Sequence, residues 1–124
     1  MERDKINDLF ENRLGMMPED AIDLIKSYFV KYLRHFILID EYNLKSGHWC
    51  VKYEFKAINI TIKCERGFLD KWVFINGNKV SLTDFEPLIG NAKMGSEKNI
   101  HFTLDVIKRY VESSSAGDSK NGYE

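Results

Sequence analysis

The chain has 124 residues, a length that suits one domain with a core of its own. Its formal net charge of −1 excludes a general basic field for nucleic acid, and it contains no run of about eighteen apolar residues that would predict a membrane-spanning helix. The first ten residues lack the apolar stretch of a secretory signal, so the sequence predicts a cytoplasmic protein.

Two helices are predicted before any strand. Residues 3–14 place apolar side chains at helical spacing, and Gly15 follows them as a C-cap glycine would. Residues 18–35 begin with Pro18 and keep one face apolar, which favours a second helix. Carboxylates are concentrated in both segments: the first carries Asp4, Asp8 and Glu11, and the second begins with Glu19, Asp20 and Asp23.

Five antiparallel strands are predicted next, because the apolar period changes from 3.6 to 2. The segment FILIDEY, residues 36–42, is expected to be a well-buried first strand. HWCVKYEF and INITIKC alternate apolar and polar residues, and they are expected to form a hairpin that pairs Phe55 with Ile58. KWVFI and NKVSL flank Asn76-Gly77, which is the strongest short-range signal for a hairpin.

Helical signals return after the last strand. Thr83 and Glu86 have the spacing of a capping box, and Thr103 is expected to cap a last helix. Residues 113–124 have no periodicity, so they are predicted to be a disordered tail after a single domain of residues 1–112. The predicted fold class is therefore α+β, with two N-terminal helices, a five-stranded antiparallel meander, a short helix and a C-terminal helix.

The two cysteines are expected to stay reduced. The predicted hairpin places Trp49 opposite Cys64 and Cys50 opposite Lys63, so the two sulfur atoms lie on opposite faces of the sheet. A one-residue bulge would change this count. Reduced thiols also agree with a cytoplasmic location.

Catalytic readings of the strands are weak. Asp40, Glu54 and Lys56 follow the order Asp…Glu-x-Lys of metal-dependent nucleases, in which two carboxylates hold a divalent cation. A half-solvated strand produces Glu-x-Lys as well, and Lys56 falls at the predicted turn. His48 and Cys50 share one strand face, but structural zinc takes four such ligands and catalytic zinc three. We therefore expect no enzyme, metal or cofactor, and keep the nuclease as an alternative.

Charge is distributed unevenly along the chain. Residues 26–79 hold ten basic and five acidic side chains, whereas residues 1–24 hold seven acidic and three basic ones. Lys52, Lys56 and Lys63 could follow a nucleic-acid backbone, but the aromatic residues beside them alternate onto the face predicted to be buried. A nucleic-acid-binding module is therefore a disfavoured alternative.

The acidic N-terminal part has two readings. Its carboxylates complement the positive ends of helices and form a solvated face, or they form a docking surface for a basic protein partner. The sequence does not separate the two.

A resemblance covers residues 36–90. The stretch HWCVKYEFKAINITIKCERGFLDKWVFINGNKVSLTDFEPLIG resembles the central sheet of bacterial immunity proteins of polymorphic-toxin and contact-dependent growth inhibition systems. The shared features are an alternating hairpin, the turn ERG, a second hairpin and the step SL into a short helix.

The resemblance implies a non-enzymatic protein that binds and neutralises the toxic C-terminal domain of a cognate effector, often a nuclease. Toxin nucleases are frequently basic, so the preferred contact is the set of six carboxylates Asp4, Asp8, Glu11, Glu19, Asp20 and Asp23. An exposed edge strand, which a partner would extend by β-augmentation, is the second contact considered.

Overall fold

The computed structural model describes residues 16–44 and 47–122, with side chains described as far as residue 114. The elements run in the order α2 (Pro18–Tyr32), β1 (Ile37–Leu44), β2 (His48–Phe55), β3 (Ile58–Glu65), β4 (Phe68–Ile75), β5 (Asn78–Lys79), α3 (Leu82–Phe85), the 3-10 helix η1 (Pro87–Asn91) and α4 (Glu97–Gly122). The strands form one antiparallel sheet in the order β1-β2-β3-β4-β5. This arrangement confirms the predicted α+β class and the five-stranded meander.

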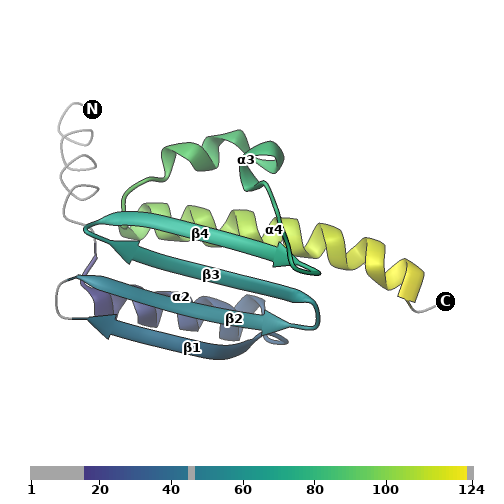
Figure 1. The fold of residues 1–124 in the computed structure, drawn as a ribbon, viewed down its shortest axis with the longest axis horizontal. Coiled ribbons are helices and arrows are strands. Elements are labelled where there is room, and N and C mark those ends of the chain that lie inside the picture. Colours follow the sequence, from purple (N-terminus) through teal and green to yellow (C-terminus); the bar gives the residue numbers. More distant parts are fainter. Residues whose placement is uncertain (1–15, 45–46, 123–124) are drawn as a thin grey trace.

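The sheet has one face covered by helices and one face without them. Figure 1 shows α2 and α4 behind the strands, with α3 beyond the β4 edge. The core lies between the sheet and these helices, where Trp49, Ile60 and Val73 of the strands pack with Phe29 of α2 and Leu104 of α4. In the described residues no helix covers the other side, which we call the open face. None of the helices in this part of the chain has the length and apolar character needed to cross a bilayer.

One helix, α2, precedes the sheet in the described residues, where the sequence predicts two. The predicted helix over residues 3–14 lies outside the described residues. Helix α2 has Pro18 in its first turn and Glu19 and Asp20 near its positive end, as predicted. It ends at Tyr32 rather than at residue 35, because Leu33 leaves helical geometry with φ −132° and ψ 52°.

The central hairpin has the predicted register. Phe55 pairs with Ile58, and Trp49 pairs with Cys64. Cys50 and Cys64 are both buried and lie on opposite faces of the sheet, so the predicted placement of the two sulfur atoms is confirmed. Alternation of the strand residues, which sorts apolar side chains onto the covered face, therefore sets this register.

The prediction of a well-buried first strand is wrong. Strand β1 lies at the edge of the sheet, and seven of its eight residues are exposed. Its sequence reads as buried because Ile37, Leu38 and Ile39 are consecutive apolar residues. Burial of a strand depends on its position in the sheet as well as on its composition, and the local sequence does not encode that position.

The predicted cap of the short helix is also wrong. Ser81 rather than Thr83 is the N-cap of α3, and the Ser81 Oγ accepts a hydrogen bond from the Asp84 backbone N–H at 3.3 Å. Glu86 instead caps η1, where its carboxylate accepts from the Leu88 N–H at 3.3 Å. Ser81 and Thr83 are both residues that can cap a helix. The capping-box pattern favours Thr83 because Glu86 follows it by three positions, and this is the reason for the wrong prediction.

Helix α4 begins earlier than predicted. It starts at Glu97, and the Ser96 Oγ accepts a hydrogen bond from the Asn99 N–H at 3.2 Å. Thr103, the predicted cap, lies fully buried inside the helix, and its hydroxyl oxygen has no hydrogen-bond partner. At the other end α4 continues to Gly122, into the segment expected to be disordered. The domain boundary at residue 112 stays a prediction.

Candidate functional site

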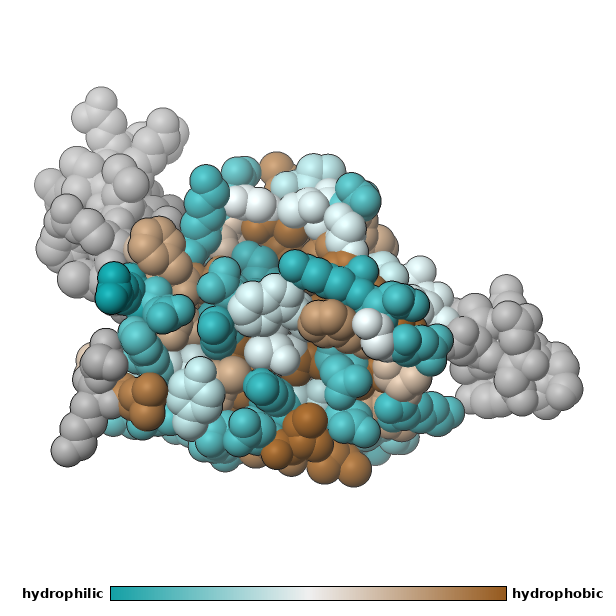
Figure 2. Space-filling model, viewed as in Figure 1, coloured by the Kyte–Doolittle hydropathy of each residue, from teal (hydrophilic) through white to brown (hydrophobic). Residues whose placement is uncertain are grey.

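The edge of the sheet formed by β1 exposes large apolar side chains. The exposed fractions are 68% for Ile37, 50% for Ile39, 40% for Tyr42 and 48% for Leu44. We call these four residues the β1 edge. Figure 2 shows hydrophobic residues gathered over β1, at the lower margin of the molecule. Singly exposed apolar residues are ordinary, but four large ones on a single edge strand are unusual and are typical of an interaction surface.

The backbone of β1 is free to pair with another strand. Along β2, alternate residues direct their backbone groups to β3 and to β1. Cys50 and His48 are among those that bond to β1. Their partners on β1, Tyr42 and Leu44, therefore direct their N–H and C=O groups to β2. The N–H and C=O groups of Glu41 and Asn43 therefore point away from the sheet. In the described residues no strand lies on that side.

Part of β1 carries the features that protect a sheet edge. The register shifts between Leu38 and Asp40, so Ile39 is an extra residue at a bulge. Asp40 and Glu41 add charge, and the Glu41 carboxylate forms an ion pair with the Lys26 ammonium of α2 at 3.0 Å. Bulges and charges deter unspecific pairing of edge strands. The regular stretch that remains for a specific partner follows the bulge.

A small apolar cavity lies beside the start of β1. It has a volume of about 230 Å³ and is lined by Phe29, Val30, Arg34, Phe36 and Tyr53. The Phe29 and Tyr53 rings stack at a centroid distance of 3.7 Å. Burial, with a smaller effect from the Glu41 carboxylate, raises the pKa of Tyr53 to about 12. Val30 is 71% exposed, so this cavity offers a binding pocket for one apolar side chain next to the β1 edge.

The structure describes three of the six predicted partner-binding carboxylates. Glu19, Asp20 and Asp23 are all exposed on α2, and Asp4, Asp8 and Glu11 lie outside the described residues. Glu19, Asp23 and Val30 recur at spacings of four and seven along α2, so they share one stripe of the helix. That stripe runs from the cavity beside β1 toward the start of α2.

The open face holds aromatic residues that the sequence analysis did not consider. Strand β4 places Trp72 and Phe74 on this face, opposite Thr61 and Asn59 of β3. The Lys63 ammonium lies 5.4 Å from the centroid of the Trp72 ring. The sequence contains a signal for this placement: Leu69 and Val73 of β4 are buried on the covered face, and alternation puts Trp72 and Phe74 on the opposite face. Acidic residues share the face as well, so its charge is mixed: Asp40, Glu54, Glu65 and Asp70 stand among Lys52, Lys63 and Lys79.

The structure places two residues of the nuclease alternative, Asp40 and Glu54, on one face of the sheet, but Lys56 does not join them. Asp40 is opposite Lys52 on the open face, and Glu54 lies on the same face two residues along β2. Lys56 occupies the β2–β3 turn with φ 54°, and its ammonium lies 5.2 Å from the centroid of the Phe55 ring, which belongs to the covered face. In the described residues no group of three or more His, Cys, Asp or Glu side chains is arranged to hold a metal ion.

His48 and Cys50 share the open face, as the sequence predicts. Cys50 is buried there, and burial raises the pKa of its thiol, although the Lys52 ammonium and a hydrogen bond with the Tyr42 side chain oppose this shift. Burial likewise raises the pKa of the Cys64 thiol on the other face. Both thiols therefore favour the protonated form, which is the less nucleophilic one.

Comparison of the chain with protein-family models, with curated proteins and with solved structures finds no match.

Proposed function

We propose that this protein is a non-catalytic immunity protein, which binds the toxic C-terminal domain of a cognate effector and neutralises it. The observation that supports this proposal most is the β1 edge, where exposed apolar side chains occur on a strand whose outer backbone groups pair with no other strand in the described part of the chain. This combination suits β-augmentation, in which main-chain hydrogen bonds give affinity and neighbouring pockets give specificity.

The proposed contact combines the β1 edge and the cavity beside it. A partner strand would pair with the N–H and C=O groups of Glu41 and Asn43 after the bulge. An apolar side chain from the same partner would enter the cavity between Phe29 and Phe36. A few buried anchors of this kind usually carry most of the binding energy of an interface.

The carboxylates of α2 have a separate role in this proposal. Glu19 and Asp23 share the helix stripe that continues from the cavity, so they would face a partner that is docked on β1. A basic toxin domain would be attracted by them during association, and the effect would weaken with ionic strength. The contribution of Asp4, Asp8 and Glu11 stays a prediction.

The proposal expects a large effector to be encoded beside this gene, and the test uses the C-terminal domain of that effector. Asn43→Pro removes one N–H group that points to the partner, and an edge strand tolerates proline at such a position. Asn43→Ala is the matched control, because it removes the side chain and keeps the N–H. We expect Asn43→Pro to weaken binding by about 100-fold and to lose protection from toxicity, whereas Asn43→Ala changes affinity by less than about threefold.

Two results would contradict the proposal in different ways. Equal affinity of the two variants, with equal free energies of unfolding, would mean that the partner does not pair with β1. Absence of a neighbouring effector gene, or unchanged toxicity when the native protein is added, would contradict the immunity function itself.

Electrostatic attraction is tested by kinetics. Glu19→Lys and Asp23→Lys together are expected to slow association by about tenfold at low salt, with the difference shrinking as salt is raised. A dissociation rate that changes instead would assign these carboxylates to the buried part of the interface.

Nucleic-acid binding is the second candidate function, and the open face favours it. Trp72 and Phe74 beside Lys63 resemble a surface on which bases stack. The carboxylates on the same face oppose a phosphate backbone. Binding of single-stranded RNA that is lost in Trp72→Ala and falls steeply with salt would support this candidate over the first.

A further inference from the structure

The sheet edge opposite β1 contains a break in its pairing. Strand β5 pairs with the end of β4, and residues 93–94 bond to the start of β4. Lys71 lies between these two contacts. Leu69 donates its N–H to the Lys93 carbonyl at 2.7 Å, and Lys71, two residues further on, directs its own N–H and C=O groups to the same side. In the described residues no strand pairs with Lys71 on that side, so its backbone N–H and its side chain both lie at the break.

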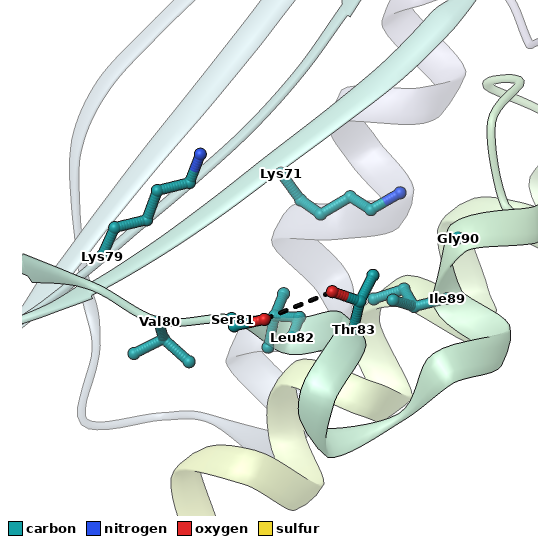
Figure 3. A pocket seen from close by; sticks show the side chains of 8 residues that line it. All are labelled: Lys71, Lys79, Val80, Ser81, Leu82, Thr83, Ile89 and Gly90. Carbon is teal, nitrogen blue, oxygen red and sulfur yellow. Dashed lines mark hydrogen bonds between the residues drawn. The ribbon is translucent and has the colours of Figure 1, made fainter.

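A cavity of about 470 Å³ occupies this break. Its lining residues are Lys71, Lys79, Val80, Ser81, Leu82, Thr83, Ile89 and Gly90. Figure 3 shows the two lysines on the strand side and the residues of α3 and η1 on the other, with open space between them. A Cβ atom added at Gly90 would have only the Thr83 Cγ2 within 4.0 Å, so the space near this glycine is open.

The polar groups of the cavity are mainly hydrogen-bond donors. Two lysines are among its lining residues, Lys71 from the covered side of the sheet and Lys79 at the rim from the open face, and none of the lining residues carries a carboxylate. The hydroxyl groups of Ser81 and Thr83 are 3.2 Å apart and share one hydrogen bond, which leaves one hydroxyl hydrogen to donate elsewhere. Val80, Leu82 and Ile89 supply an apolar part of the wall.

Lys71 is the most constrained of these donors. It lies on the covered side of the sheet, opposite Ile62, and its ammonium donates to the Ala92 carbonyl at 3.0 Å. Burial lowers its pKa, and the Asp70 carboxylate, on the open face, opposes that shift. An ammonium that is partly desolvated and has one neutral acceptor retains donors for an anion.

The geometry points to a binding site for a small organic oxyanion in this cavity, a phosphate ester or carboxylate whose apolar part rests on Val80, Leu82 and Ile89. The oxyanion group receives hydrogen bonds from Lys71 and from the Ser81–Thr83 pair, and Lys79, at the rim, adds a second positive charge at longer range. The volume exceeds the need of a bare inorganic ion, and the apolar wall selects a ligand with a carbon skeleton. This site is separate from the β1 edge and does not depend on the proposed function.

The experiment titrates the native protein, labelled for NMR, with four probes: phenyl phosphate, benzoate, inorganic phosphate and benzyl alcohol. We expect phenyl phosphate to shift the amide signals of Lys71, Thr83 and Gly90 with a dissociation constant of about 1 mM or lower, and benzoate to do so more weakly. Inorganic phosphate tests charge alone, and benzyl alcohol tests the apolar part alone. Both are expected to bind at least about tenfold more weakly.

Two lysine variants separate this site from general surface charge. Lys79→Met, at an exposed position, is expected to weaken phenyl phosphate binding by about tenfold. Lys52→Met is the matched control on the same sheet, outside the cavity, and is expected to leave the affinity unchanged. Lys71→Met is expected to abolish saturable binding, and thermal unfolding shows whether it still folds.

Three outcomes would overturn the inference. One is the absence of saturable shifts with phenyl phosphate and benzoate up to about 10 mM. Another is an equal loss of affinity in Lys52→Met and Lys79→Met, which would indicate unspecific attraction. The third is equal binding of benzyl alcohol and phenyl phosphate, which would indicate an apolar site without a role for the ammonium groups.

Discussion

The two edges of this sheet, β1 on one side and β4 on the other, are covered to different extents in the described residues. The β4 edge receives β5, the bridge between Phe68 and Met94, and the helical segment from Leu82 to Asn91. In the described part of the chain β1 receives none of these and keeps exposed apolar side chains. A sheet edge presents unpaired N–H and C=O groups, and proteins normally cover or charge it. The difference teaches that, among the described residues, the chain covers one edge itself and leaves the other uncovered, and the uncovered edge is the one we propose for a partner.

Deletion of one apolar side chain at each edge gives the largest contrast. Leu69, on β4, is 4% exposed, and Leu69→Ala is expected to lower the free energy of unfolding by about 2–5 kcal/mol because it leaves a cavity. Ile37, on β1, is 68% exposed, and Ile37→Ala is expected to cost about 0.5 kcal/mol or less. Urea unfolding measures both. Equal costs would mean that β1 is packed in solution.

Alkaline unfolding tests how well the cavity beside β1 excludes water. The pKa of Tyr53 is raised from 10.0 to about 12, so the unfolded chain loses this proton first. The contribution of Tyr53 to stability is complete below pH 10 and is lost as pH rises toward 12. We expect Tyr53→Phe to reduce the loss of stability over this interval by about 2 kcal/mol. An unchanged pH dependence would indicate a hydrated phenol.

The ion pair between α2 and β1 should have the smallest effect. The Lys26 and Glu41 side chains are 42% and 37% exposed, and their charged atoms are 3.0 Å apart. Exposed pairs contribute little, so Lys26→Ala is expected to change the free energy of unfolding by less than about 0.5 kcal/mol, and less still at high salt. A larger cost, insensitive to salt, would show that α2 holds β1 in place and that this edge is less free than the structure indicates.

The predictable part of the fold is the part with local signals. The register of Phe55 with Ile58 and of Trp49 with Cys64 follows from alternation and a two-residue turn, and both were predicted. The Asn76-Gly77 turn was predicted for the same reason, and both residues have positive φ values of 54° and 81°. These signals act between residues that are close in the chain.

The candidate site depended on relations that the local sequence does not contain. The apolar sequence around Ile37 and Ile39 predicts burial. Both side chains are exposed because β1 lies at the edge of the sheet. The cavity beside it joins Val30 of α2 to Tyr53 of β2, and no spacing rule connects them. The placement of Trp72 and Phe74 on the open face, by contrast, follows from the alternation of β4 and is contained in the local sequence. Ser81 and Thr83 can both cap α3, and only the hydrogen bond from the Asp84 N–H to the Ser81 Oγ identifies Ser81 as the cap.

The proposed pairing of β1 with a partner strand is tested most directly by amide hydrogen exchange, with the protein free and bound to the toxic domain of the effector that the proposal expects. The account predicts that the amides of Glu41 and Asn43, which point away from the sheet, become protected on binding. The amides of Tyr42 and Leu44, already bonded to β2, should change little. Protection that is absent from β1, or equal at all four residues, would contradict strand pairing at this edge.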